Sequence, residues 1–218
     1  MRGVSRNLGR RLLRRDDGLV SDNDWDVLGD YAQGTDAPQR ATATALDRLG
    51  DARTIVLVEG VSDQIAVEAL ATRLGRDLAA DGVAVVPIGG AQAARKYVES
   101  LGESGAELVG LCDFNERSYF IEALPPDDVF VCDPDLEGEF HDVLTSTEIE
   151  DAMDAEGELG SFRTFQKQRE WRDQPYADQL RRWFAAGYRR KSRYARRFMV
   201  DTPIERLPRP LLSLLERI

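Results

Sequence analysis

The chain contains 218 residues, of which 42% are hydrophobic and 31% charged, and its formal net charge is −10. This length allows one core domain of about 110 to 150 residues with appended segments. The charge falls into three blocks: six arginines and no acid in 1–15, 33 acids against 8 bases in 16–160, and 12 bases against 3 acids in 161–200. A solvated acidic surface accounts for most acids of the middle block, but not for those at predicted strand ends.

Membrane insertion and export are both excluded by the pattern. No apolar run approaches the roughly 20 residues that cross a bilayer. The basic start runs into an acidic stretch without a hydrophobic signal region. Cys112 and Cys132 each end an apolar run, which is typical of buried thiols in a reducing compartment. We therefore expect a cytoplasmic protein without a membrane partner.

Residues 1–50 predict an acidic N-terminal extension that is partly disordered. Its first 36 residues have weak hydrophobic patterning. Pro38 stands at a predicted helix start, and Gly50 follows the helix expected over residues 39–49. This short helix would deliver the chain to the first strand.

Residues 51–145 predict an α/β domain with a parallel sheet of about four strands. Short apolar runs that alternate with helical patterns are typical of this architecture. The expected helices follow Asp63 and span residues 91–101, with Ser62 or Asp63 as the cap of the first. The expected strands are residues 55–58, 83–88, 107–113 and 129–132.

Polar residues or glycines follow every predicted strand. Glu59, Asp113 and the acidic stretch 133–139 end three strands, and Asp63 lies four residues beyond Glu59. The carboxyl ends of parallel strands share one sheet edge, where ligands bind. Several carboxylates at one edge repel each other unless a cation compensates them, and oxygen ligands favour Mg²⁺ or Mn²⁺. The sequence therefore predicts a hard divalent metal site.

Other site classes fit poorly. A zinc site is disfavoured because His141 is the single histidine and the cysteines lack CxxC spacing. A serine hydrolase lacks its GxSxG elbow. The phosphate loop GxxxxGK[ST] is missing, so we expect no ATP site in this chain. Gly89 and Gly90 have two interpretations: a tight strand-to-helix turn, or a phosphate-binding turn that uses its backbone amides.

Residues 146–218 predict a helical, basic extension packed on the α/β core. Aromatic residues recur there at three- or four-residue spacing, which favours core packing. The final stretch LLSLLERI is expected to be a short apolar turn. The basic residues outside the aromatic face are candidates for phosphate contacts: Arg189, Arg190, Lys191, Arg193, Arg196 and Arg197.

Three motifs carry a family resemblance. LVEGVSD, VVPIGG and LVGLCDFNE, in this order on alternating strands, resemble the TOPRIM domain, a Rossmann-like fold. The downstream segments DPDLEGEF, GELGSFRTFQKQ and RRKSRYARRF resemble small stand-alone TOPRIM proteins related to OLD-family endonucleases. The resemblance covers residues 52 to 212. It implies that Glu59 is the general acid/base and that Asp113 holds metal.

The resemblance also implies further ligands and one departure. The second acid after the glutamate corresponds to Asp63, the later acidic motif to Glu137, and the downstream basic residue to Lys191. The usual second aspartate of the DxD motif is Asn115 here, so Asn115 or Glu116 must supply that oxygen. OLD-like enzymes carry an ATPase domain ahead of TOPRIM, so ATP control would come from a separate ATPase or other partner.

Three functions follow from these predictions. The leading one is a nuclease that hydrolyses DNA, or RNA, with two Mg²⁺ or Mn²⁺ ions. The second is a non-catalytic TOPRIM module that binds nucleic acid or a protein partner, for which Asn115 is the sequence hint. The third is nucleotidyl transfer. The sequence does not specify cleavage specificity or oligomeric state.

Overall fold

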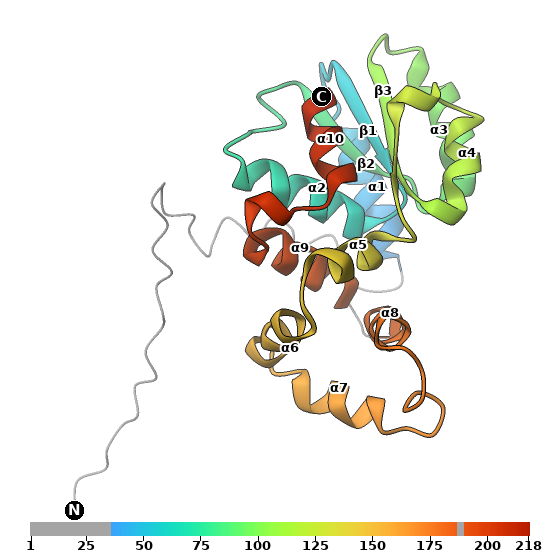
Figure 1. Ribbon diagram of the computed structural model, residues 1–218. Coiled ribbons are helices and arrows are strands. Elements are labelled where there is room, and N and C mark those ends of the chain that lie inside the picture. The colour runs from blue at the N-terminus through green and yellow to red at the C-terminus, as the bar shows by residue number, and fades with distance from the viewer. Residues whose placement is uncertain (1–35, 187–189) are drawn as a thin grey trace, which may run out of the picture.

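A four-stranded parallel sheet lies at the centre of the computed structural model, which describes residues 36–186 and 190–218 (Figure 1). The strand order is β2-β1-β3-β4. The strands are β1 (Thr54–Val58), β2 (Val83–Pro87), β3 (Glu107–Asp113) and β4 (Val129–Cys132). β1 and β3 are the two inner strands, and their apolar residues are almost completely buried. The predicted α/β fold with about four parallel strands is confirmed.

The helices follow the strands and then continue alone to the C-terminus. Those within the α/β part are α1 (Ala37–Asp47), α2 (Val61–Arg73), α3 (Ala94–Gly102), α4 (Arg117–Ile121) and α5 (Leu136–Val143). Those that follow are α6 (Ser146–Ala155), α7 (Leu159–Gln166), α8 (Tyr176–Ala186), α9 (Arg190–Asp201) and α10 (Arg209–Arg217). Short 3₁₀ turns are η3 (Ala91–Ala93), η4 (Phe114–Glu116), η5 (Pro126–Asp128) and η6 (Ile204–Arg206). Among the described residues, no helix is long and apolar enough to span a bilayer.

Each face of the sheet is covered by its own hydrophobic core. On one face, α1, α3 and α4 cover a cluster that includes Ile55, Leu57 and Phe120. On the other face, α2, α5, α9 and α10 cover a larger cluster that includes Val56 and Val109. Figure 1 shows α2, α9 and α10 on the opposite side of the strands from α3 and α4. Alternate residues of β1 therefore serve opposite cores, as the two-residue repeat of a strand requires.

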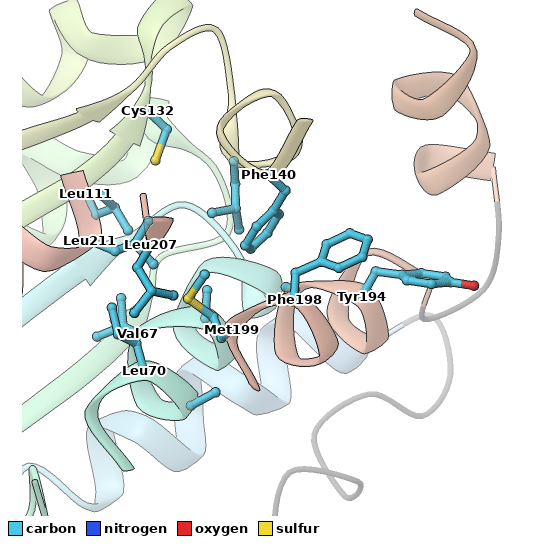
Figure 2. Packing of buried hydrophobic residues seen from close by; sticks show 14 of the residues in the cluster. Val67, Leu70, Leu111, Cys132, Phe140, Tyr194, Phe198, Met199, Leu207 and Leu211 are labelled. Atoms are coloured by element: carbon cyan, nitrogen blue, oxygen red, sulfur yellow. The ribbon is translucent and has the colours of Figure 1, made fainter. Parts of the chain in front are cut away.

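The basic helix α9 is one of the main packing elements. Tyr194, Phe198 and Met199 are buried on its inner face. Figure 2 shows these side chains along the inner side of α9, with Val67 and Leu70 of α2 nearby in the same cluster. An α-helix places residues three or four apart on one face, so the basic residues between these positions stay outside the core.

Helices α6 to α8 add aromatic rings to the larger of the two cores. The ring centroids of Phe162 and Trp183 are 5.4 Å apart, and those of Phe165 and Trp171 are 5.3 Å apart. Centroid distances of about 4.5–7 Å are favourable for aromatic pairs. The expected packing role of the aromatic residues is thus observed for those that the structure describes. Tyr188 and Arg189 lie outside the described residues.

Two local predictions were wrong. Helix α2 begins at Val61 with Gly60 as its N-cap, and Asp63 occupies the third helical position instead of the cap. The stretch LLSLLERI forms most of α10. Arg76 donates hydrogen bonds to the carbonyls of Leu215 and Ile218 at 2.6 and 3.0 Å. These long-range bonds satisfy carbonyls at the helix end, which local patterning did not reveal.

We expect Gly110→Ala to destabilise the protein by about 1–3 kcal/mol, because the added methyl group overpacks the core. A Cβ atom at Gly110 would lie 2.5 Å from Phe120 Cδ1 and 3.1 Å from Leu124 Cδ1. Urea unfolding measures the change. The matched control is Gly160→Ala in α7, where the same methyl group meets no heavy atom within 4 Å. Equal stabilities of the two variants would contradict the tight packing of α4 on β3.

Candidate metal centre

The two inner strands bring Glu59 and Asp113 together. β1 and β3 are paired in parallel, so their carboxyl ends lie side by side. The backbone N–H of Asp113 donates a hydrogen bond to Glu59 Oε1 at 2.8 Å. This bond aims the glutamate side chain across the end of the neighbouring strand. The structure thereby joins the two acids that the strand-end argument had placed at one edge.

Glu116 completes a group of three carboxylates. One oxygen each of Glu59, Asp113 and Glu116 lies within 4.8 Å of the other two. Glu116 reaches this position because the 3₁₀ turn η4 follows Asp113 directly. Asn115, in the same turn, is exposed. Of the two residues proposed to replace the missing second aspartate, Glu116 is the one that contributes a carboxylate oxygen.

Asp63 lies beside this group, at the start of α2. Its Oδ2 atom accepts a hydrogen bond from the backbone N–H of Gly60 at 2.9 Å. The same contact stabilises the first turn of the helix, because it pairs a backbone N–H that has no partner within the helix. Asp63 therefore has a structural role in addition to its proposed role as a metal ligand.

Burial and mutual repulsion raise the pKa values of these acids. Burial raises the pKa of Asp113 to about 8, with further contributions from Asp63 and Glu59. Burial likewise raises the pKa of Asp63 to about 7, assisted by Glu137 and Glu59. Burial also raises the pKa of Glu59, although its hydrogen bond from Asp113 opposes the shift. When these acids are ionised, the sheet edge therefore carries more negative charge than the cations of the protein neutralise there.

Lys191 and Glu137 form the second part of the site. Lys191 Nζ lies 3.0 Å from Glu137 Oε2, and the glutamate side chain is only 10% exposed. Burial disfavours the ammonium ion, but the attraction of Glu137 outweighs it and raises the pKa of Lys191. Asp63 and Asp113 contribute to the same shift. The lysine predicted from the downstream basic motif thus stands as a cation in the field of the acidic edge.

Asp135 orders the segment that carries Glu137. It is the N-cap of α5, and its Oδ1 atom accepts from the N–H of Gly138 at 2.8 Å. Arg181 Nε of α8 lies 2.6 Å from the other Asp135 oxygen. Neither Asp135 nor Arg181 was predicted from the sequence as a site residue. The N-cap spacing could have identified Asp135, whereas Arg181 carries no local signal.

Gly89 and Gly90 form a tight turn beside the site. Both adopt positive φ angles, 78° and 120°, that residues other than glycine rarely adopt. Their backbone N–H groups each donate to the carbonyl of Glu59 at 3.0 Å. Since these amides are already engaged, the geometry favours the turn interpretation. The turn fixes the backbone that carries Glu59.

Most described bases of α9 are paired with acids. Arg190 and Arg193 both reach Glu158, at 2.8 and 2.9 Å. Arg197 lies 3.5 Å from Glu156 and also pairs with Asp201. Arg190 additionally covers the Trp183 ring, with its guanidinium carbon 3.8 Å from the centroid. Arg196 is half-buried in the same helix. The geometry therefore places these arginines in a structural network between α9 and the α6–α7 connection.

The carboxylate group fits a hard divalent cation by its donor chemistry. Its ligand atoms are oxygens only, which suits Mg²⁺ or Mn²⁺. The nearest cation assigned to the site, Lys191, is paired with Glu137 and not with the group of three. A divalent ion bound there would relieve the repulsion that raises the acid pKa values.

Comparison with known proteins finds a family match over the segment from β1 to β3. Residues 52–114 match the family described as Overcoming lysogenization defect (OLD) protein-like, TOPRIM domain. This segment contains Glu59, Asp63 and Asp113 and runs from the start of β1 to the end of β3. The chain carries an OLD-related TOPRIM domain. No curated protein sequence matches the chain.

Solved structures extend the similarity of the fold beyond that segment. The C-terminal region of the Burkholderia pseudomallei OLD protein is 19% identical, with a TM-score of 0.56, and the match covers 76% of this chain and 96% of that one. The C-terminal region of the Xanthomonas campestris pv. campestris OLD protein is 22% identical, with a TM-score of 0.57 and coverages of 78% and 94%. The OLD-type TOPRIM fold thus includes helices beyond the family match.

We expect the metal-free protein to lose stability as the pH rises from about 4 to about 8. Asp63 and Asp113 have folded-state pKa values of about 7 and about 8, against 3.8 as the ordinary value. The folded state then binds more protons than the unfolded state in this window, so deprotonation favours unfolding. Thermal melts in EDTA should show a fall of at least roughly 3 °C between pH 6 and 8, about 1 kcal/mol for this size.

Asp113→Asn is the matched comparison, because the amide cannot ionise. Its melting temperature should depend less on pH than that of the wild type over the same interval. Parallel curves for the two proteins would mean that Asp113 titrates like an ordinary surface acid.

We expect Arg190→Gln to act on stability rather than on nucleic-acid binding. The loss of its ion pair with Glu158 should cost about 1–3 kcal/mol in urea unfolding, because the hydrogen bond involves charged groups. The salt dependence of binding should not change, whereas loss of one phosphate contact lowers the slope by roughly 0.7–0.9. Arg182→Gln is the control, since Arg182 is exposed on the neighbouring helix α8. A lower slope for Arg190→Gln with unchanged stability would restore the phosphate role predicted from the sequence.

Proposed function

We propose that this protein is a divalent-metal-dependent nuclease that hydrolyses phosphodiester bonds in DNA. The observation that carries the proposal is the convergence of Glu59, Asp113 and Glu116 at the end of β1 and β3. Lys191 adds a positive charge to the same edge. Carboxylates for metal and a cation for phosphate are the groups that phosphoryl-transfer chemistry requires.

Bound Mg²⁺ or Mn²⁺ would supply an acidified water molecule and charge stabilisation at phosphate oxygens. Glu59, Asp113 and Glu116 would hold it, with Asp63 and Glu137 as further oxygen donors if two ions are bound. Glu59 has a second role, because the backbone N–H of Asp113 holds its carboxylate at the edge where the reacting groups would meet. It is our candidate for the general acid/base.

Lys191 is the candidate for stabilising charge on the reacting phosphate. Its ammonium group keeps its proton at neutral pH, because the neighbouring carboxylates raise its pKa. Glu137 holds it by a hydrogen bond of 3.0 Å. A fixed cation that needs no rearrangement during the reaction stabilises a developing charge more effectively than a mobile one.

A polymeric substrate suits the form of the site. The acidic group is half-buried, and the exposed turn η4 and helix α4 continue from it. A cleft of about 650 Å³ lies between α1, α2 and the edge strand β2, and its lining does not include the three carboxylates. This favours a surface that a nucleic-acid strand can cross over an enclosed small-molecule pocket.

The non-catalytic alternative rests on Asn115, which replaces the second aspartate of the motif and is exposed. A module of this kind would bind nucleic acid or a protein partner and leave DNA intact. Control by a separate ATPase remains a prediction for either function. Cleavage assays separate the two possibilities directly.

We expect wild-type protein to cleave supercoiled or linear DNA with Mg²⁺ or Mn²⁺ and not with EDTA. Glu59→Gln and Asp113→Asn should each lower the cleavage rate by at least about 100-fold, because each removes a group that acts on the reacting atoms. Gel electrophoresis of the products measures the rate, and parallel reactions with RNA test the substrate class.

Glu103→Gln is the matched control, since Glu103 is an exposed acid at the end of α3. It should cleave like the wild type, and circular dichroism should show that all variants are folded. Full activity of both site variants would contradict the assignment of the site. An inactive wild type would favour the binding module.

A further inference from the structure

Exposed apolar side chains gather in one short segment next to the carboxylates. Among the described residues, the large exposed hydrophobic side chains are Leu74, Phe114, Tyr119, Ile121 and Ile204. Three of these five lie within residues 114–121, directly after Asp113. Single exposed apolar residues are normal on a protein surface, but a local group of them marks an interaction site.

Phe114 and Arg117 form a stacked pair within this segment. The guanidinium carbon of Arg117 lies 4.1 Å from the centroid of the Phe114 ring. Phe114 is 38% exposed, and its backbone N–H donates to the carbonyl of Pro134 at 3.2 Å, which anchors the turn. Glu116, which contributes to the carboxylate group, stands between the two residues in the sequence. The pair is therefore held at the rim of the candidate metal centre.

Arg117 differs from the arginines of α9 in its partners. Within the part of the chain that the structure describes, it forms no ion pair, and its contact is with the Phe114 ring. Arg117 is exposed, so its guanidinium N–H groups are available for a ligand. Arg117 and Phe114 are both exposed, so a planar ligand group can reach the pair from solvent.

We propose that Phe114 and Arg117 form a platform that stacks an unpaired base of the substrate, so that the preferred substrate is single-stranded or locally unpaired nucleic acid. This inference rests on the proposed nuclease function and names its substrate class. Aromatic rings and guanidinium planes are the groups on which unstacked bases pack. Duplex bases have both faces covered by their neighbours and offer no face to the platform.

The position of the pair favours nucleic acid over a protein partner. The platform is covalently continuous with Asp113 and Glu116, so a strand whose phosphate lies at the carboxylates can reach Phe114 and Arg117 within about one or two nucleotides. The guanidinium edge can also donate to a phosphate oxygen. A purely apolar protein contact would not require a guanidinium group on the ring.

The test uses the full chain in EDTA with three fluorescent 15-mer probes: single-stranded DNA, a blunt duplex, and an abasic strand that has phosphates without bases. Fluorescence anisotropy measures each Kd. Wild type should bind the single strand more tightly than the duplex or the abasic strand. Phe114→Ala and Arg117→Ala should weaken single-strand binding by roughly 5- to 100-fold, as for loss of one stacked base, and should change abasic-strand binding much less.

Conservative variants and a matched control separate stacking from charge. Phe114→Trp should retain single-strand affinity, whereas Arg117→Lys should lose much of it because the planar group is gone. Arg95→Ala, which removes an exposed charge on the neighbouring helix α3, should have little effect. Melting temperatures within about 2 °C of the wild type would show intact folding, since exposed substitutions rarely change stability strongly.

The outcomes distinguish this inference from the proposed function. Equal losses on the single strand and the abasic strand, or no loss in either alanine variant, overturn the platform and leave the nuclease intact. Single-strand binding that depends on the platform, without any cleavage in Mg²⁺ or Mn²⁺, overturns the nuclease and leaves the platform. If the alanine variants lose self-association in sedimentation and keep their strand binding, the segment is a protein contact and the assignment is overturned.

Discussion

The hydrogen bond from the Asp113 backbone to the Glu59 carboxylate is the contact on which the site depends. It is possible because β1 and β3 are adjacent and parallel, so that Glu59, one residue past the end of β1, lies beside the last residues of β3. The bond brings the Glu59 carboxylate beside the end of β3, where it repels the Asp113 carboxylate and contributes to its raised pKa. The sheet, buried on both faces, supplies the rigidity that holds like charges together.

Much of this edge follows from the sequence by simple reasoning. Apolar runs that stop at Glu59 and Asp113 predict parallel strands with acids at their ends, and the sheet confirms the strands. The approach of Glu116 to the other two acids could not be predicted in this way, because it depends on the 3₁₀ turn after β3. A turn of three residues has no periodicity that a sequence pattern could reveal.

The basic C-terminal block shows where charge counting is insufficient. Twelve bases in 161–200 indicate a surface that binds a polyanion. However, Glu156 and Glu158 precede the block and pair with Arg190, Arg193 and Arg197. These pairs join residues more than 30 positions apart, so only the tertiary structure shows them. By contrast, Arg117 stands alone in an acidic stretch of sequence, and its stacking on Phe114 gives it a distinct surface role.

The position of Lys191 in the chain has a consequence for how the site is assembled. The carboxylates come from residues 59 to 137, whereas the lysine follows the separate helical lobe α6–α8 and returns on α9 to meet Glu137. A ribosome synthesising this chain from its N-terminus therefore releases all the acids well before the lysine. All the acids of the site are therefore synthesised before the cation that pairs with Glu137, and only η6 and α10 follow α9 in the chain.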